Sequence, residues 1–226
     1  MKVLQLIDRA ALDPNVYTGN VHLVLGSSNA LEDVNTLVDV GMDPTIVERI
    51  AKIMTGVGKT PVEQVVLTHQ HFDHVGMLQA VRKTWRPRVY AFSPMDGVDK
   101  LVRHRQILRI GDRDFEVLHT PGHSHDSICL YCEQDGVLFC GDTPLLIQTG
   151  GASYEDDFVR ALEHLATLNI ETVYFGHGPP LTGGVTERIR HSLANVTGTR
   201  RHGNVRPALA TAGHEGHVAE AGLPGQ

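Results

Sequence analysis

The chain has 226 residues, of which 41% are hydrophobic and 20% charged, and its formal net charge is −6 at pH 7. This length fits one domain, and the composition is that of a globular protein with enough apolar residues for a packed core. The negative charge argues against nucleic acid or an anionic membrane as a general partner. No apolar run is long enough to span a bilayer.

The start of the chain and its cysteines indicate a cytoplasmic protein. The apolar run before Asp8 is too short to form a signal peptide. Cys129, Cys132 and Cys140 lie in strand-like segments, so we expect buried free thiols rather than a disulfide framework. Cys129 and Cys132 are three residues apart and face opposite sides of a strand, which argues against a redox or zinc pair.

The first half of the chain alternates predicted strands with predicted helices. Strands are expected over residues 21–25, 35–40, 65–68 and 88–92. Asp43 is the predicted N-cap of a helix that has Pro44 at its first position and carries an apolar stripe through Ile46 and Ile50. A second helix is expected from after His74 to about Thr84.

The second half begins with a strand-rich stretch and ends with helices. Strands are expected over residues 106–110, 114–119, 127–132, 137–140 and 172–175. Amphipathic helices are expected over residues 154–168 and 187–196. Interleaved strands and helices favour a layered α/β domain over residues 1–198. Residues 199–226 lack periodicity and are predicted to be a disordered C-terminal tail.

The most informative motif follows the predicted strand at residues 65–68, where His69, His71, Asp73 and His74 form an H-x-H-x-D-H string. Imidazole and carboxylate groups are ligands of zinc and of iron or manganese. His69 and His71 are two residues apart on an extended segment, so their side chains project the same way and can bind one metal. Asp73 and His74 lie where the chain turns into a helix, which directs them to a neighbouring point. The motif therefore predicts two adjacent metal sites.

Three later segments each place a metal-binding side chain beside glycine at the end of a predicted strand. His123 and Asp142 each follow a glycine, and His177 lies between two. Glycine permits the backbone angles and close approaches that such loops need, and functional residues gather in loops on rigid scaffolds. Taken singly, each residue has an alternative role in turn hydrogen bonding. Together with the first motif, they predict a composite metal centre.

This ordered set of residues resembles the metallo-beta-lactamase superfamily. The segment Leu37-Val38-Asp39-Val40-Gly41 is similar to the first motif of that family, and the resemblance spans about residues 20 to 180. It implies an αββα sandwich, in which two mixed sheets are flanked by helices and the site lies at one edge between them. Within that family, the segments around His123 and Asp142 are similar to the glyoxalase II branch.

The resemblance also implies two divalent metal ions, with zinc expected first and iron or manganese accepted by the same ligands. The first metal would be bound by His69, His71 and His123, the second by Asp73, His74 and His177, and Asp142 would bridge the two. Asp39 is expected to orient a ligand histidine through its other ring nitrogen. The alternative for Asp39 is a turn residue at the end of a strand.

Such a centre implies hydrolysis without a covalent nucleophile. A hydroxide bridging the two metals would attack a carbonyl group, and Asp73 would handle the proton as the catalytic residue. The chain lacks the G-x-S-x-G motif of serine hydrolases. The expected enzyme is therefore a binuclear, metal-dependent hydrolase of a small-molecule carboxylic ester, lactone or thioester.

The substrate-binding residues are less well defined by the sequence. Phe72 before the motif aspartate is shared with lactonases that open acyl-homoserine lactones, in which a Tyr follows the bridging Asp. Leu145 occupies about that place here, and Tyr154 could substitute if the loop folds back. His125 could contact substrate or orient His123, or it could serve turn chemistry alone. The glutathione-binding Lys and Tyr of glyoxalase II are not evident, and the apolar loop after Asp142 suits either an acyl substrate or a homodimer contact.

Three other activities agree less well with the sequence. Persulfide dioxygenases resemble this scaffold and bind a single iron, for which His69, His123 and Asp142 would suffice. The intact remainder of the ligand set argues against that alternative. A beta-lactamase with a Cys ligand would place it where Asp142 stands. A phosphodiesterase or nuclease would carry a large insertion between Asp142 and His177, where this chain has only a loop, a helix and a strand.

Overall fold

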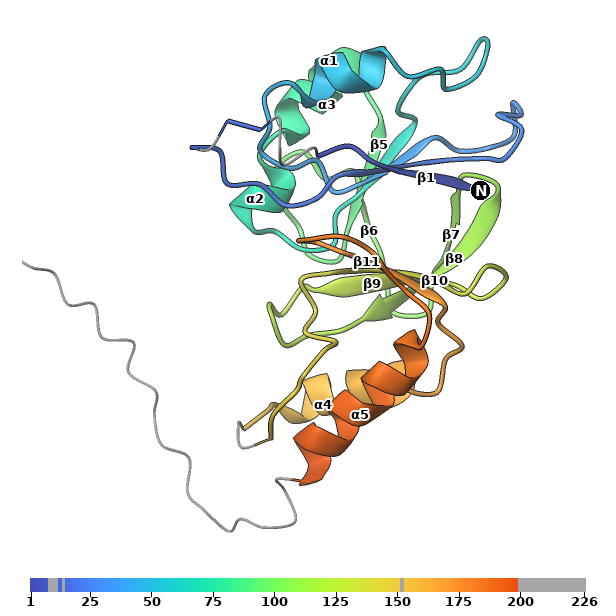
Figure 1. Cartoon of the computed structure of the whole chain (residues 1–226). Coiled ribbons are helices and arrows are strands. Elements are labelled where there is room, and N and C mark those ends of the chain that lie inside the picture. The colour runs from blue at the N-terminus through green and yellow to red at the C-terminus, as the bar shows by residue number, and fades with distance from the viewer. Residues whose placement is uncertain (8–11, 14, 151–152, 199–226) are drawn as a thin grey trace, which may run out of the picture.

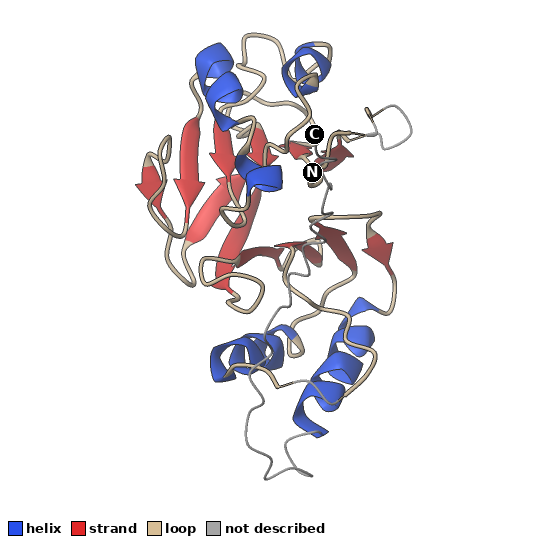
Figure 2. Cartoon of the chain, turned by 90° about the vertical axis from the view of Figure 1, so that its left-hand side faces the viewer, coloured by secondary structure: helices blue, strands red, loops and turns tan. Residues whose placement is uncertain are grey.

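The computed structural model describes residues 1–7, 12–13, 15–150 and 153–198. Two six-stranded sheets lie face to face, with helices on both outer sides (Figure 1, Figure 2). This is the predicted αββα sandwich, and the prediction of two mixed sheets flanked by helices is confirmed. The predicted C-terminal tail, residues 199–226, lies outside the described residues.

The first sheet is built from the N-terminal half of the chain. Its strands follow one another in order as β1 (Lys2–Gln5), β2 (His22–Leu25), β3 (Thr36–Val38), β4 (Gln64–Val66), β5 (Arg88–Ala91) and β6 (Lys100–Leu101). The pairs β1–β2 and β2–β3 are antiparallel, whereas β3, β4, β5 and β6 run parallel. Helices connect β3 to β4 and β4 to β5, because a parallel crossover needs a long connection, whereas β5 and β6 are joined by a loop.

The second sheet is built from the C-terminal half. Its strands are β7 (Ile107–Ile110), β8 (Arg113–His119), β9 (Ile128–Cys132), β10 (Val137–Gly141), β11 (Thr172–Phe175) and β12 (Leu181–Thr182). All of its neighbouring pairs are antiparallel except β10–β11, which is parallel. The parallel pair is connected by a long segment that contains a helix.

The helices cover the outer faces of the sheets. They are α1 (Ile46–Ala51), α2 (Phe72–Val75), α3 (Leu78–Trp85), α4 (Asp156–Leu165) and α5 (Val185–Gly198). The side chains Ile46 and Ile50 of α1 and Leu78 and Val81 of α3 pack in one core cluster with the first sheet. A separate cluster joins α4 and α5 to the second sheet. Four of the helices, α1, α3, α4 and α5, thus bury an apolar stripe against the nearest sheet, whereas α2 buries Asp73 and His74.

Strand alternation divides the apolar residues among three layers. In β4, Val65 faces the helices while Val66 faces the core between the sheets. In β9, Cys129 joins the layer under α4 and α5, whereas Cys132 joins the layer between the sheets. Successive strand side chains point to opposite faces, which produces this pattern. The predicted opposite orientation of Cys129 and Cys132 is confirmed, and all three cysteines are free and buried.

Several predicted element boundaries were wrong. The helix expected after His74 is two helices, because α2 begins before that residue and the chain breaks at Gly76 before α3. The helix expected from Tyr154 begins at Asp156 and ends at Leu165. Asp43 is not the N-cap of α1. Thr45 occupies that position. The Asp43 carboxylate, two residues before it, accepts a hydrogen bond from the Thr45 N–H at 2.9 Å.

Candidate metal centre

Most of the predicted ligands lie in loops beyond the carboxyl ends of strands, where the two sheets meet at one edge, and Asp73 and His74 lie in α2. Asp39 follows β3 and His69 follows β4, while Asp142 follows β10 and His177 follows β11. Each of these four strands has a parallel neighbour, so their carboxyl ends lie on the same side. His123 arrives from the loop after β8. Residues distant in sequence are therefore brought together by the topology.

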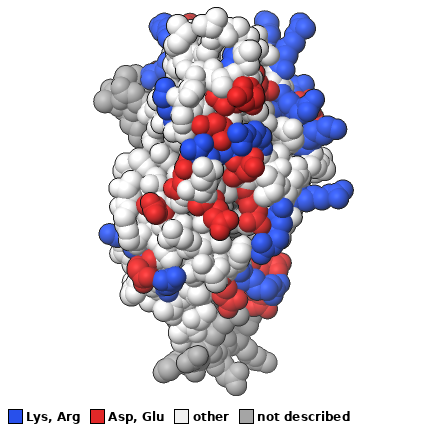
Figure 3. All heavy atoms as spheres, turned by 90° about the vertical axis from the view of Figure 1, so that its right-hand side faces the viewer, with Lys and Arg blue, Asp and Glu red and all other residues white. Residues whose placement is uncertain are grey.

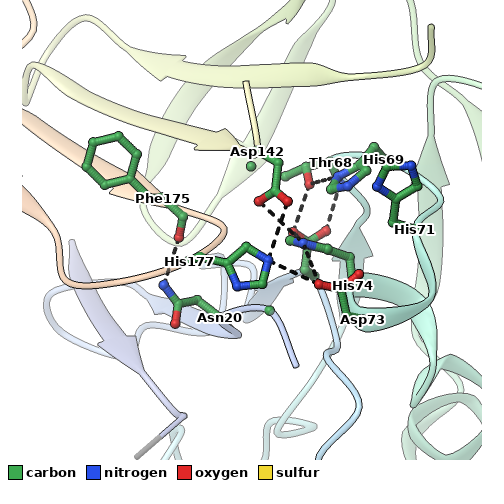
Figure 4. A network of polar contacts seen from close by, with 12 residues as sticks. Asn20, Thr68, His69, His71, Asp73, His74, Asp142, Phe175 and His177 are labelled. Carbon is green, nitrogen blue, oxygen red and sulfur yellow. Dashed lines mark hydrogen bonds and ion pairs between the residues drawn. The ribbon is translucent and has the colours of Figure 1, made fainter. Parts of the chain in front are cut away.

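The seven predicted ligands form overlapping clusters (Figure 4). In each cluster, one nitrogen or oxygen atom from every residue lies within 4.8 Å of the corresponding atoms of the others. The clusters are His69 with His71 and His123, His69 with His74 and Asp142, and Asp73 with His74 and His177. The first and the third are the two ligand groups expected from the sequence. The second cluster connects them.

Asp142 lies between the two ligand groups. Its Oδ2 atom is 3.6 Å from Nε2 of His123 and 3.4 Å from Nε2 of His177, and its Oδ1 atom is 3.4 Å from Nε2 of His74. One carboxylate therefore faces histidines of both groups. This is the position that a bridging ligand requires.

Asp39 holds the histidine ring that is most deeply buried in the cluster. Its Oδ2 atom is 2.9 Å from Nδ1 of His74, and the same carboxylate accepts the backbone N–H of Thr68 and its hydroxyl, both at 2.8 Å. The Thr68 hydroxyl also lies 3.0 Å from Nδ1 of His69. With Nδ1 of His74 and of His69 engaged in this way, their Nε2 atoms are left to face the centre.

The electrostatics of the cluster favour cation binding. Burial lowers the pKa of His69 to about 4, which keeps this imidazole neutral. Burial acts in the same direction on His74, but Asp39 and Asp142 outweigh it and raise the pKa of His74 to about 10. For Asp142 burial opposes ionisation, yet His177 and His74 hold its pKa well below the usual range. The centre thus places the ionised carboxylate of Asp142 beside the neutral His69 and the protonated His74, and a metal ion can replace the His74 proton.

Two buried nitrogens test whether the residues fit a metal. Nε2 of His69 and Nε2 of His74 are shielded from solvent, and neither has a hydrogen-bond partner in the described part of the chain. A buried nitrogen without a partner costs free energy, and a metal ion aimed at its lone pair removes that cost. His74 Nε2 has only longer contacts with Asp73 and Asp142, at 3.5 and 3.4 Å. The donor set therefore fits divalent metal ions of the zinc, iron or manganese type.

Glycine keeps the centre open where the loops approach each other. A Cβ atom on Gly176 would lie 2.0 Å from Oδ1 of Asp142 and 2.7 Å from Cε1 of His74. Any side chain at this position would displace both groups. The requirement for Gly176 therefore comes from space rather than from backbone conformation.

The three predicted substrate-binding residues, Leu145, Tyr154 and His125, differ in how close they lie to the ligands and in how exposed they are. A cavity of about 340 Å³ beside the ligands is lined in part by Leu145 and Leu146. Leu145 is only 2% exposed and belongs to the core under α4 and α5. Tyr154 packs on that same core and against Phe158, with ring centroids 5.4 Å apart. His125 is exposed, and its carbonyl accepts a hydrogen bond from Nε2 of His119 at 2.8 Å.

Three exposed apolar side chains lie beside the ligands, and the sequence did not single them out as substrate-binding residues. Tyr17 is 61% exposed and stacks on the ring of His177, with centroids 5.4 Å apart. Phe72 is also 61% exposed and lies 6.2 Å from Tyr17, while Leu146 is 43% exposed. For Leu146, the sequence offered one indication: neighbouring residues of an extended loop point to opposite sides, so Leu145 and Leu146 could not both be buried. Nothing in the local sequence connects Tyr17 with a histidine so far along the chain.

Comparisons with known proteins agree with this geometry. The family model described as the metallo-beta-lactamase superfamily matches residues 15–94 and 92–177. A hydroxyacylglutathione hydrolase of Chromohalobacter salexigens is 37% identical over 121 residues, which cover 50% of this chain and 47% of that protein. The atrochrysone carboxyl ACP thioesterase nsrC of Aspergillus novofumigatus is 26% identical over 185 residues, which cover 76% of this chain and 57% of that protein. The chain spans about half the length of these curated relatives.

A solved structure shows the same architecture. The crystal structure of ETHE1 from Myxococcus xanthus is similar with a TM-score of 0.65 and 23% sequence identity, covering 87% of this chain and 85% of that one. At this identity the likeness concerns the fold alone. The family match extends over both halves of the sandwich and includes every predicted ligand. The chain therefore belongs to the metallo-beta-lactamase superfamily.

Proposed function

We propose that the protein is a metal-dependent hydrolase that cleaves a thioester, ester or lactone bond of a small acyl substrate, and that it holds two divalent cations. The observation that carries this proposal is the convergence of two ligand groups on the shared carboxylate of Asp142. A chain built to hold one ion would have no need for two such groups side by side.

The first cation would be held by His69, His71 and His123, and the second by Asp73, His74 and His177, with Asp142 between them. Divalent cations bound there would act as Lewis acids toward a carbonyl oxygen. They would also lower the pKa of bound water to near neutrality. The nitrogens and carboxylates of the chain determine where this chemistry takes place. Asp39 and Thr68 fix the imidazole rings of His74 and His69 through their Nδ1 atoms.

Asp73 is the residue we propose to move the proton. Its side chain is buried, and Oδ2 faces Nε2 of His177 at 3.1 Å. This carboxylate belongs to the second ligand group, and we propose that it takes a proton and delivers it to the leaving oxygen or sulfur. A positioned acid–base group of this kind accelerates reactions by roughly 10²- to 10⁴-fold.

The surroundings of the centre support an acyl substrate. Tyr17, Phe72 and Leu146 place exposed apolar surface beside the ligands. Small-molecule sites combine apolar walls with a few polar groups in this way. The names of the two curated relatives, a hydroxyacylglutathione hydrolase and a carboxyl ACP thioesterase, both describe acyl groups carried on a thiol.

Charge also favours a small substrate over a nucleic acid. The net charge is −6, and on the face drawn in Figure 3 the acidic and basic side chains are interspersed. A cavity of about 920 Å³ lies beside the amino ends of β4 and β5, away from the ligands. It is lined by both acidic and basic groups, among them Glu63, Asp99 and Arg88. The part of the chain that the structure describes has no helix long and apolar enough to cross a membrane.

The test combines metal analysis with a hydrolysis panel. The purified chain is loaded with Zn²⁺, Fe²⁺ or Mn²⁺ and assayed on acyl thioesters, aryl esters, lactones and phosphodiesters. We expect two bound ions per chain and turnover of a thioester, ester or lactone that a chelator abolishes. One bound iron with oxygen consumption on a persulfide would support the dioxygenase alternative, which uses only His69, His123 and Asp142. Turnover of phosphodiesters alone would also contradict the proposal.

A further inference from the structure

We infer that Asn20 is a positioning residue that holds the loop of His177 in the second ligand group, so that its removal weakens the second metal selectively. This inference rests on the proposed binuclear centre. Asn20 belongs to a short segment before β2, residues 18–20, that no motif of the sequence analysis included.

Asn20 binds the main chain on both sides of His177 (Figure 4). Its side-chain amide donates hydrogen bonds to the carbonyl oxygens of Phe175 at 2.9 Å and Gly178 at 2.7 Å. Its backbone N–H donates to the carbonyl of Gly176 at 2.6 Å. The side chain is almost fully buried, at 1% exposure, so water does not compete for these bonds. One residue therefore fixes the loop just before and just after the histidine.

The neighbours of Asn20 bind the other half of the second ligand group. The N–H of Gly19 donates to the carbonyl of Asp73 at 2.9 Å. A Cβ atom on Gly19 would lie 2.7 Å from Cε1 of His74, so the ring packs directly on the glycine backbone. The hydroxyl of Thr18 accepts the N–H of Met42 at 2.7 Å and anchors the segment. Residues 18–20 thus connect the loop of Asp73 and His74 with the loop of His177.

This connection matters because the second ligand group spans both sheets. Asp73 and His74 follow β4 of the first sheet, whereas His177 follows β11 of the second. Beyond Phe175 the chain leaves β11, and the Gly176 N–H makes one more bond to the neighbouring strand, to the carbonyl of Gly141 at 2.7 Å. The Gly178 carbonyl also accepts a hydrogen bond from Nε2 of Gln5 at 3.3 Å. Asn20 adds the bonds that tie the main chain on both sides of His177 to the segment before β2. Hydrogen-bond partners behind a metal ligand change metal affinity by about 10- to 100-fold.

The chain offers a matched control for a purely structural effect. Asn35 is also fully buried, and its amide donates to the carbonyls of Thr55 and Thr60, both at 3.0 Å. It fixes a loop in the same manner, but that loop carries no predicted ligand. Asn20→Ala and Asn35→Ala remove comparable bonds and should lower the unfolding midpoint of the metal-free protein to similar extents. Only the first change touches the second ligand group.

The experiment is a two-step Zn²⁺ or Co²⁺ titration of the full chain against a competing chelator, followed by Co²⁺ absorption spectra. We expect Asn20→Ala to weaken one of the two binding steps by about 10- to 100-fold and to leave the other step unchanged. Asn35→Ala should leave both steps unchanged. Asn20→Ser, which keeps one donor, should fall between wild type and Asn20→Ala. If the alanine variants do not fold, the serine variants of both positions carry the same comparison.

Three contrary results are possible, and they separate the positioning role from the binuclear centre. If Asn20→Ala binds both metals as tightly as Asn35→Ala, the positioning role is overturned while the binuclear hydrolase stands. If the wild-type chain has a single binding step, both the positioning role and the binuclear centre are overturned. Equal weakening of both steps in the Asn20 variant alone would also overturn the selective role.

Discussion

The two ligand groups of the centre differ sharply in how the chain supports them. In the first group only His69 is buried, whereas His71 and His123 are exposed and contact each other, with Nδ1 and Nε2 at 2.8 Å. In the second group Asp73 and His74 are buried, and Asp39 holds the His74 ring from behind. The second group is therefore held by more buried contacts, with His177 half-buried. The first group is more open to solvent.

This difference teaches that one composite motif can form two sites of unequal order. Ligands that are fixed in advance lose little conformational freedom on binding, whereas exposed rings must be immobilised. We expect the second group to retain its metal longer during removal by a chelator. The first group, open to solvent at His71 and His123, would then be where ligands exchange and substrate enters.

The largest effect is expected at the residue that both groups share. Asp142→Ala removes the carboxylate that faces His74, His123 and His177. Loss of a direct ligand should exceed the roughly 10- to 100-fold cost of losing an outer partner, so we expect kcat/KM to fall by more than about 100-fold. Metal analysis and steady-state kinetics check this. A variant that keeps both metals and its activity would remove Asp142 from the centre.

A pH effect is expected beneath the second group, at His22. Burial lowers the pKa of His22 to about 4, which the charge of Asp39 only partly offsets. Because the folded pKa lies below that of the unfolded chain, near 6.5, the unfolded state binds the proton first. Stability is therefore fully present above about pH 6.5 and is lost as the pH falls towards 4, by about 3 kcal/mol.

The measurement for His22 is urea unfolding of wild type and His22→Leu at several pH values between 7 and 4. The leucine variant has no group to titrate here and should lose this part of the acid dependence. If both proteins lose stability in parallel over that range, the buried His22 is not its source.

A smaller effect is expected from removing the support of His74. Asp39→Ala deletes the acceptor of His74 Nδ1 and of two donors of Thr68. We expect one metal step to weaken by about 10- to 100-fold, with the metal of the first group less affected. Isothermal titration with Zn²⁺ checks the result. An equal loss in both steps would mean that Asp39 acts through the fold as a whole and not through the second group.

The smallest effect is expected on the open side of the centre. Leu146 lines the cavity beside His123 and is partly exposed. Leu146→Gln should remove about 1 kcal/mol of apolar contact and raise KM for acyl substrates about fivefold, with kcat little changed. Leu31→Gln, at another exposed leucine that does not line the cavity, serves as the control. Equal KM values for the two variants would exclude Leu146 from substrate binding.

Strand and helix periodicity predicted a layered α/β domain, and the resemblance of the ligand motifs to a known family implied the sandwich. The clustered residues could be named in advance because ligand spacing is a local pattern. Three strands were not predicted: β1 lies near the start of the chain, and β6 and β12 are only two residues long. Leu145 lines the cavity beside the ligands, but most of its side chain is buried, and Leu146 is the more exposed of the two. Asn20 and Tyr17 could not be predicted, because their contacts with the His177 loop cross between sheets over more than half of the chain.

The central claim is most directly tested by counting metal ions in the wild-type chain, His123→Ala and His177→Ala, after loading with Zn²⁺ and removal of free metal. We expect two ions in the wild type and one in each variant, with the ion left in His123→Ala released more slowly by a chelator than the ion left in His177→Ala. A wild-type chain that holds one ion, and keeps it when His177 is replaced, would exclude the binuclear centre.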